Sequence, residues 1–392
     1  MASNADAISA PGMAGLPPAI LADVADCLSL DVTVAFATAC AATHAAAIHA
    51  STCRKVLGHQ LVAAKSNRKA AIVDPRVALH VLKRARRSLL VVDLSAKDVS
   101  VGVFASEEFP YGPTLYGKPR RSPAFVALLD FIQSAKFHES TSAQLSVLRV
   151  HLPLQWPAFR FDAAWHRSLT ELSLHVDAGM PSEESATVGQ WLGAVSACRA
   201  LTSLSLVTST GLEQQPVRAA SYAEAQCDLP LGLRRLFLGG MYVDRHLRAG
   251  VQRLPKLEIL TLWQCFVPKL FEVFERCAFH GTLRHLRLHA TVAFAQYGQR
   301  HIDAIAHNLR TCLETLLIPY AFWFIGDASA LIDMSALKSV TFGGADAEDL
   351  EDGGDTFEAL VQRGVAVSDD CYGVFGRDVL TAAAASDGGM DT

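Results

Sequence analysis

The sequence of 392 residues lacks a strong excess of charge of either sign. Its 35 lysines and arginines stand against 39 aspartates and glutamates, which gives a formal net charge of -4. Proteins that bind nucleic acid or anionic membranes by general electrostatic attraction carry a marked basic excess. We therefore expect neither a nucleic-acid partner nor a membrane partner.

The cysteines lack the spacing of a metal site or of a disulfide framework. There are nine, and no two form a CxxC pair. An odd number of thiols, in a chain long enough to fold without covalent cross-links, is typical of reduced cysteines inside the cell. Residues 1–14 also lack the basic and apolar regions of a secretory signal. These features predict an intracellular protein, in the cytoplasm, the nucleus or both.

Strongly apolar runs of membrane-spanning length are missing, although 51% of the residues are hydrophobic. The uncharged segment 32–53 is rich in alanine and includes His44 and His49. A membrane span needs about 20 strongly apolar residues, which this segment does not supply. The segment therefore favours a buried helix of a soluble protein.

Catalytic motifs are also missing from the sequence. It contains no GxxxxGK, HExxH or GxSxG motif, and no GxGxxG after a strand. His285 and His289 would share one strand face about 13 Å apart, which is too far for one zinc ion. We expect no catalytic residue, no metal, no cofactor and no enzymatic activity.

The sequence does contain a repeat, in which leucines recur as Leu-x-x-Leu-x-Leu. Five full copies begin at Leu169, Leu201, Leu233, Leu257 and Leu283. Weaker copies begin at Leu89, Leu145, Leu313 and Leu337. Successive copies from Leu145 onward lie between 24 and 32 residues apart. A repeat of this length predicts a solenoid in which each copy contributes one strand.

Segments with helical periodicity lie between the predicted strands. They are residues 124–137, 182–198, 269–279 and 301–312. Nine strand–helix units predict an α/β solenoid with the three leucine-type positions of each copy in the core. Residues 364–367 are predicted to form a final edge strand.

The repeats resemble the leucine-rich repeat family over residues 87–367. The copy most similar to the family pattern contains Leu257, Leu260, Leu262, Cys265 and Val267. The position of Cys265 usually holds asparagine or cysteine, which bonds backbone groups at the turn, and the other copies depart from this pattern. The resemblance implies a leucine-rich repeat solenoid over residues 87–370 and a C-terminal tail over residues 371–392.

A different pattern precedes the repeats and resembles an F-box. The residues that match in order are Leu16, Pro17, Ile20, Leu21, Val24, Leu28, Asp31 and Cys40. Ala19 replaces the common glutamate, and no tryptophan follows Cys40. The resemblance implies a small all-α module over residues 15–60. A disordered segment would precede it at residues 1–14, and a helical linker or cap would follow at residues 61–86. The alternative is an unrelated helical cap that shields the first repeat.

The strand alternation also predicts which side chains line the concave face of the solenoid. Residues two, four and six places after the first leucine of a copy point away from the core. In the early repeats these include Arg149, His151, Glu171, Ser173 and His175. The candidate site comes from the later repeats and contains Arg235, Phe237, Trp263, His285, Arg287 and His289.

An exposed tryptophan and phenylalanine beside arginines are typical of the centre of a protein interface. We therefore expect truncation of Trp263 to weaken partner binding and to leave the fold intact. The alternative is that neighbouring loops cover Trp263 and Phe237.

The two resemblances together imply the substrate-recognition adaptor of a Skp–cullin–F-box ubiquitin ligase. Leu16, Pro17, Ile20, Leu21, Val24 and Leu28 would dock on the Skp adaptor, which binds the cullin scaffold. The concave face would hold a substrate protein near the ligase. The alternative is a leucine-rich repeat interaction scaffold with no ligase role, and the missing motifs disfavour an enzyme built on the solenoid.

Overall fold

The computed structural model divides the chain into two compact units. The first holds residues 1–97 and 120–148, and the second holds residues 98–119 and 149–392. The structure describes residues 55–57, 79, 82–83, 91–93, 127, 130–132, 134, 137, 139, 145–153, 167–177, 192–193, 195–209, 228–263, 265–289, 298–319, 328–343 and 354–370.

The described part of the first unit contains a parallel strand pair. Strand β1 (Lys55–Leu57) pairs with β2 (Val91–Asp93), and Val56 lies opposite Val92. A parallel pair needs a crossover connection, and the described residues between the strands include a helical turn at Leu82 and Lys83. The Phe131 and Phe137 rings meet edge to face, with centroids 5.5 Å apart. Leu82, Val92 and Ile132 are fully buried, so this unit has an apolar core of its own.

The second unit is built on a parallel sheet whose strands follow one another in sequence order. It contains most of β3 (Val147–Pro153) and all of β4 (Glu171–Asp177), β5 (Ser203–Ser209), β6 (Arg235–Gly239), β7 (Ile259–Trp263), β8 (His285–His289), β9 (Thr315–Pro319), β10 (Ser339–Gly343) and β11 (Ala366–Asp370). These nine described strands give an α/β architecture that is consistent with the predicted solenoid.

The strand register stacks the central leucines of the repeats in one row. Leu172, Leu204, Leu236, Leu260, Leu286, Leu316 and Val340 occupy the same position in β4 to β10. Each is at most 2% exposed. The first and third leucine-type positions of these repeats are also buried, so the predicted core positions are confirmed.

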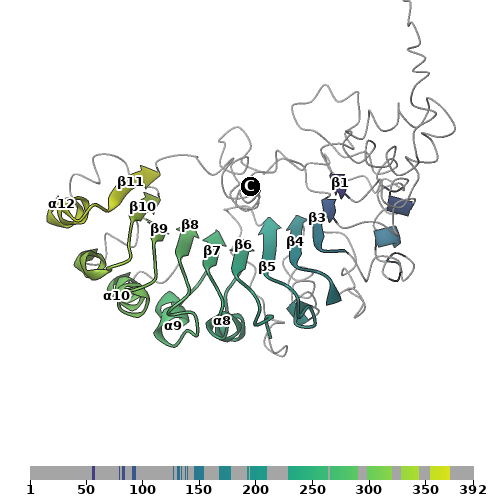
Figure 1. Ribbon diagram of the computed structural model, residues 1–392, viewed down its shortest axis with the longest axis horizontal. Helices are drawn as coiled ribbons and strands as arrows, with labels where there is room; N and C mark the ends of the chain where they lie inside the picture. Colours follow the sequence, from purple (N-terminus) through teal and green to yellow (C-terminus); the bar gives the residue numbers. More distant parts are fainter. Residues whose placement is uncertain are drawn as a thin grey trace, which may run out of the picture. The chain divides into compact units, whose positions relative to one another are not determined.

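The helices of the second unit lie on one side of the strand row (Figure 1). The helices whose bounds are described are α8 (Arg245–Gln252), α9 (Leu270–Glu275), α10 (Gly298–Leu309) and α12 (Gly354–Gln362), with a 3₁₀ helix η8 (Ala328–Asp333). A helix is about 10 Å wide and neighbouring strands are about 4.8 Å apart. Stacked repeats therefore curve with the strands on the inner side, which Figure 1 shows for β4 to β11.

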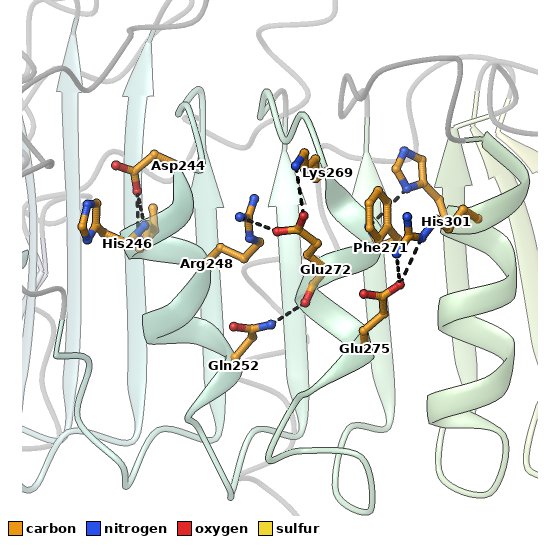
Figure 2. A network of polar contacts seen from close by, with 11 residues as sticks. Asp244, His246, Arg248, Gln252, Lys269, Phe271, Glu272, Glu275 and His301 are labelled. Atoms are coloured by element: carbon orange, nitrogen blue, oxygen red, sulfur yellow. Dashed lines mark hydrogen bonds and ion pairs between the residues drawn. The ribbon is translucent and has the colours of Figure 1, made fainter.

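Neighbouring helices are joined by polar contacts, which Figure 2 shows. The Arg248 guanidinium of α8 lies 2.5 Å from the Glu272 carboxylate of α9. The Arg300 guanidinium of α10 lies 2.7 Å from the Glu275 carboxylate and stacks on the Phe271 ring. The Phe271 N–H donates to Nδ1 of buried His301 at 3.1 Å. These contacts link three successive repeats on the helix side.

A second row of charged side chains runs along the residues that precede the strands. Arg234, Glu258, Arg284, Glu314 and Lys338 occupy equivalent positions in five successive repeats, and their charges alternate in sign. The ion pairs join Arg234 to Glu258 at 2.9 Å, Arg284 to Glu314 at 3.8 Å, and Lys338 to Glu314 at 2.5 Å. We call these five residues the charged row.

Two sequence predictions need correction or addition. Lys55–Leu57 fall inside the module that is predicted to be all-α over residues 15–60, but they form β1, because they pair with β2. Helices α9 and α10 confirm two of the predicted helical segments, whereas α8 and α12 were not predicted. Most of residues 61–86 and the whole of 371–392 lie outside the described residues.

The membrane test of the sequence concerned residues 32–53, which lie outside the described part. Within the described part, none of the helices combines the length and the apolar character of a membrane span.

Candidate functional site

The predicted site residues come together on three neighbouring strands. The register aligns Arg235, Ile259 and His285 in one row across β6, β7 and β8. The next row contains Phe237, Thr261 and Arg287, and the last contains Gly239, Trp263 and His289. The six predicted residues therefore fill six of the nine positions of one grid, which we call the concave grid. Ile259, Thr261 and Gly239 complete it.

Most of the concave grid is partly exposed, as the strand alternation predicted. Arg235, Phe237, His285, Arg287 and His289 all have intermediate exposure. Three positions of the grid are buried instead, namely Gly239, Thr261 (5% exposed) and Trp263 (4% exposed). The expectation of an exposed tryptophan is therefore wrong: Trp263 is covered, as the alternative has it, whereas Phe237 stays partly exposed.

Gly239 explains how the Trp263 side chain reaches its buried position. A Cβ atom added at Gly239 would lie 3.1 Å from Trp263 Cε3, 3.1 Å from Val207 Cγ1 and 3.3 Å from Phe237 Cε1. These distances are too short for ordinary packing, so the missing side chain leaves the space that the three neighbours use. The result is an apolar cluster of Val207, Phe237 and Trp263 that crosses three strands.

The two histidines of the concave grid are held in the neutral form. Burial lowers the pKa of His289 from 6.5 to about 4. The pKa of His285 is lowered mainly by burial and next by the Arg287 charge, while the Glu314 carboxylate opposes the shift. His285 Nδ1 lies 2.9 Å from the Thr315 hydroxyl of β9. At neutral pH the positive charge of the concave grid therefore comes from its two arginines.

The lowered pKa of His289 predicts a loss of stability in mild acid. The unfolded chain takes up a proton near pH 6.5, whereas the folded chain resists protonation until about pH 4. Stability is therefore retained above pH 6.5 and falls as the pH drops through that window. We expect the free energy of unfolding to decrease by roughly 2 kcal/mol between pH 7 and pH 5 through this residue, as measured by urea denaturation at a series of pH values.

A matched pair of variants isolates the contribution of His289. His289→Gln removes the titrating ring and should flatten the pH dependence over this window. His307→Gln removes an exposed histidine of α10 and should leave the slope unchanged. An unaltered slope in His289→Gln would show that this ring is not the group responsible.

Cys265 holds the turn after β7, as its position in the repeat predicted. Its Sγ lies 3.3 Å from the Leu238 carbonyl oxygen and 3.5 Å from that of Trp263. Cys198, Cys265, Cys277 and Cys312 are all buried free thiols. Burial raises the pKa of Cys198 and Cys265 to about 12, which makes them poor nucleophiles. Within the described ranges, no three metal-binding side chains gather around one point.

The earlier repeats present a different arrangement on the same face. The Arg149 Nε of β3 donates to the Glu171 carboxylate of β4 at 2.6 Å, and both side chains are 27% exposed. Here the arginine is neutralised by a neighbouring strand. His151 and His175 lie in β3 and β4, but their side chains are outside the described part, whereas Ser173 is partly exposed.

Some predicted site residues lie outside the described part of the chain, and some residues of the observed site were not predicted. Leu16, Pro17, Ile20, Leu21, Val24 and Leu28, the predicted docking residues, lie outside the described residues. Gly239 of the concave grid and Val207 of the apolar cluster were not among the predicted site residues. The available signal was a glycine at a concave position beside a tryptophan on the next strand.

Comparisons with known proteins give no further assignment: no protein-family model matches the chain, and no curated protein matches it.

Proposed function

We propose that this protein is a non-enzymatic adaptor that binds a partner protein on the concave side of its parallel sheet. The observation that carries the proposal is the concave grid, where Arg235 and Phe237 of β6 and Arg287 of β8 lie partly exposed on either side of β7. Arginine and aromatic side chains are the residues that dominate protein interfaces. Neutral histidines beside them add polar contacts at the rim.

The dimensions of the sheet favour a macromolecular partner. Nine parallel strands at about 4.8 Å spacing extend over about 38 Å. A standard protein interface covers an extended surface on each partner, whereas a small ligand is enclosed in a concave pocket. The strand face of the second unit is an extended surface of the kind that binds a protein.

The finer form of the proposal is a substrate-recognition adaptor of a Skp–cullin–F-box ubiquitin ligase. It is supported by the F-box-like sequence at residues 16–40 and by the solenoid-like sheet that follows. Leu16, Pro17, Ile20, Leu21, Val24 and Leu28 dock on the Skp adaptor, and the sheet holds the substrate protein. The adaptor acts by raising the concentration of the substrate near the ligase.

A pull-down with the purified Skp adaptor tests this role. The full chain should be retained, because the docking residues supply an apolar helix face. The double substitution Ile20→Asp and Leu21→Asp should abolish retention, since two buried charges oppose docking. Ala22→Asp is the matched control, because residue 22 lies on the opposite face of the predicted helix. Deleting residues 1–50 should also abolish retention while keeping β1, which begins at Lys55.

The outcomes separate the adaptor from an interaction scaffold. If the full chain is not retained, or if Ala22→Asp loses retention as fully as the double variant, the ligase role is excluded and the scaffold remains. Thermal unfolding of each variant, followed by circular dichroism, shows whether a loss of retention reflects a loss of folding.

A further inference from the structure

We propose that the edge of the second unit at which the strands begin is a further interaction surface, which binds an acidic region of a partner protein. The strands β4 to β11 are parallel and follow one another in sequence order, so all of them begin at the same edge of the sheet (Figure 1). The inference goes beyond the proposed function and does not depend on binding at the concave grid.

The segments that lead into these strands form one continuous surface. The Arg234 N–H donates to the Thr202 carbonyl at 2.8 Å, the Glu258 N–H to that of Arg234 at 2.7 Å, and the Arg284 N–H to that of Glu258 at 2.8 Å. Eight such segments at a strand spacing of about 4.8 Å extend over about 34 Å, which suits a protein interface better than a small ligand. We call them the strand-start edge: residues 167–170, 196–202, 228–234, 253–258, 276–284, 310–314, 334–338 and 363–365.

Cations outnumber carboxylates on the strand-start edge. Its ten cations are all exposed, namely Arg167, Arg199, Arg234, Arg253, Lys256, Arg276, Arg284, Arg310, Lys338 and Arg363. Its three carboxylates are those of Asp228, Glu258 and Glu314. The cations remain in twofold excess when Glu275 and Asp333, the last residues of α9 and η8, are counted with them. This local excess contrasts with the net charge of the whole chain, which is -4.

Ion pairs neutralise only part of this positive charge. Asp228 pairs with Arg253 at 2.6 Å, and the two carboxylates of the charged row are shared by its three cations. Arg310 and Arg363 donate to main-chain carbonyl oxygens of a neighbouring repeat, at 2.8 and 2.9 Å. A carbonyl oxygen satisfies a donor but carries no formal charge, so both guanidinium groups keep their attraction for a partner's carboxylates.

An exposed leucine on the same edge favours a protein partner. Leu231 lies in the segment before β6 and is 60% exposed. Arg199 belongs to the preceding segment, and its carbonyl oxygen would lie 3.6 Å from a Cβ atom at Gly232, so the two segments are in contact. Lys256 belongs to the following segment. An apolar contact with charged groups around it is the usual arrangement of a protein interface.

Nucleic acid fits the strand-start edge less well. Glu258 and Glu314 lie within the row of cations, where they would oppose a phosphate backbone, whereas a folded protein can place neutral or basic groups opposite them. Single-stranded nucleic acid also binds by stacking its bases on aromatic side chains. These segments contain one phenylalanine, Phe279, and neither tyrosine nor tryptophan, and the Phe279 ring is fully buried.

Fluorescence anisotropy with two labelled peptides tests the inference on the full chain. One peptide repeats Glu-Glu-Leu-Ser three times, and the other repeats Glu-Glu-Ser-Ser three times, so that the two differ only in their leucines. We expect saturable binding of the leucine-containing peptide, which weakens with added salt because the cations are exposed. The leucine-free peptide should bind more weakly, since it has no apolar contact with Leu231.

A matched pair of double variants locates the binding site. Arg199→Gln combined with Lys256→Gln should weaken binding of the leucine-containing peptide by about tenfold, because each cation supplies a charge-assisted contact. The control combines Arg245→Gln with Lys269→Gln, an exposed arginine and an exposed lysine that follow β6 and β7 at the opposite ends of the strands. It changes the net charge equally and should leave the affinity unchanged.

A single variant tests the apolar contact. Leu231→Ser should lower the affinity of the leucine-containing peptide to that of the leucine-free peptide and leave the latter unaltered. Thermal unfolding of each variant, followed by circular dichroism, should match that of the unaltered chain, because all the substituted side chains are exposed.

Several results would overturn the inference. Absence of peptide binding by the unaltered chain would do so, and unchanged binding in the Arg199 and Lys256 double variant would place the peptide elsewhere. Equal losses in the two double variants would indicate a general charge effect. Equal affinities of the two peptides, or of Leu231→Ser and the unaltered chain, would remove the apolar contact. Tighter binding of a labelled twelve-nucleotide oligothymidylate would favour nucleic acid.

Discussion

Replacing Trp263 with alanine is expected to lower the free energy of unfolding by about 3–5 kcal/mol. The side chain is 4% exposed and lies against the space left by Gly239, beside Val207 and Phe237. Truncation would remove most of these contacts and leave a cavity that the rigid strand backbone cannot close. Urea denaturation followed by far-ultraviolet circular dichroism measures the change.

Two further variants test whether Trp263 is a buried residue or an exposed interface residue. Trp263→Phe keeps part of the ring volume and should lose less stability than Trp263→Ala. Phe237→Ala removes a partly exposed ring of the same cluster and should also lose less. A loss below about 1 kcal/mol in Trp263→Ala would contradict the buried position, because surface substitutions fall in that range.

Replacing Leu260 with alanine is expected to lower the free energy of unfolding by about 2–5 kcal/mol. Leu260 is fully buried in β7 and lies in register between Leu236 and Leu286. The cavity would therefore open at the centre of the stacked leucine row, where repeats on both sides depend on it. Since a repeat contacts mainly its neighbours, amide hydrogen exchange should show the largest loss of protection in β6, β7 and β8.

Leu231→Ala is the matched control for this substitution. Leu231 precedes β6 and is 60% exposed, so the same change in volume should alter stability by less than about 0.5 kcal/mol. Equal losses in the two variants would contradict the assignment of Leu260 to the core. A uniform loss of protection over β4 to β11 would contradict local coupling between repeats.

The strands of the second unit could be predicted because their information is local. Each Leu-x-x-Leu-x-Leu copy places three apolar residues on one side, and β4 to β10 form where these copies occur. Grouping the six candidate residues on neighbouring strands needed only the repeat spacing and the alternation of a strand. The register then aligned Arg235 with His285 and Phe237 with Arg287, two strands away.

The burial of Trp263 could not be predicted in the same way, because it depends on residues of other repeats. The alternation correctly assigned Trp263 to the concave side, but the space beside its ring is left by Gly239 and bordered by Val207, which lie on the two preceding strands. Strand β1 was missed for a related reason: Lys55–Leu57 is three residues long, and its only strand signal is a partner at Val91–Asp93. Helix α8 had a local signal, since Asp244 accepts hydrogen bonds from the His246 and Leu247 backbone at its start.

The charged row also makes the order of the repeats matter. Its signs run positive, negative, positive, negative and positive from Arg234 to Lys338. Deleting one repeat between Arg234 and Lys338 makes two residues of like charge neighbours in the charged row. Deleting two adjacent repeats keeps the signs alternating. Each exposed ion pair contributes little to stability, but two like charges meet in every arrangement that removes an odd number of these repeats. Repeats with nearly identical cores are therefore not interchangeable, and this part of the chain tolerates rearrangement by pairs better than by single units.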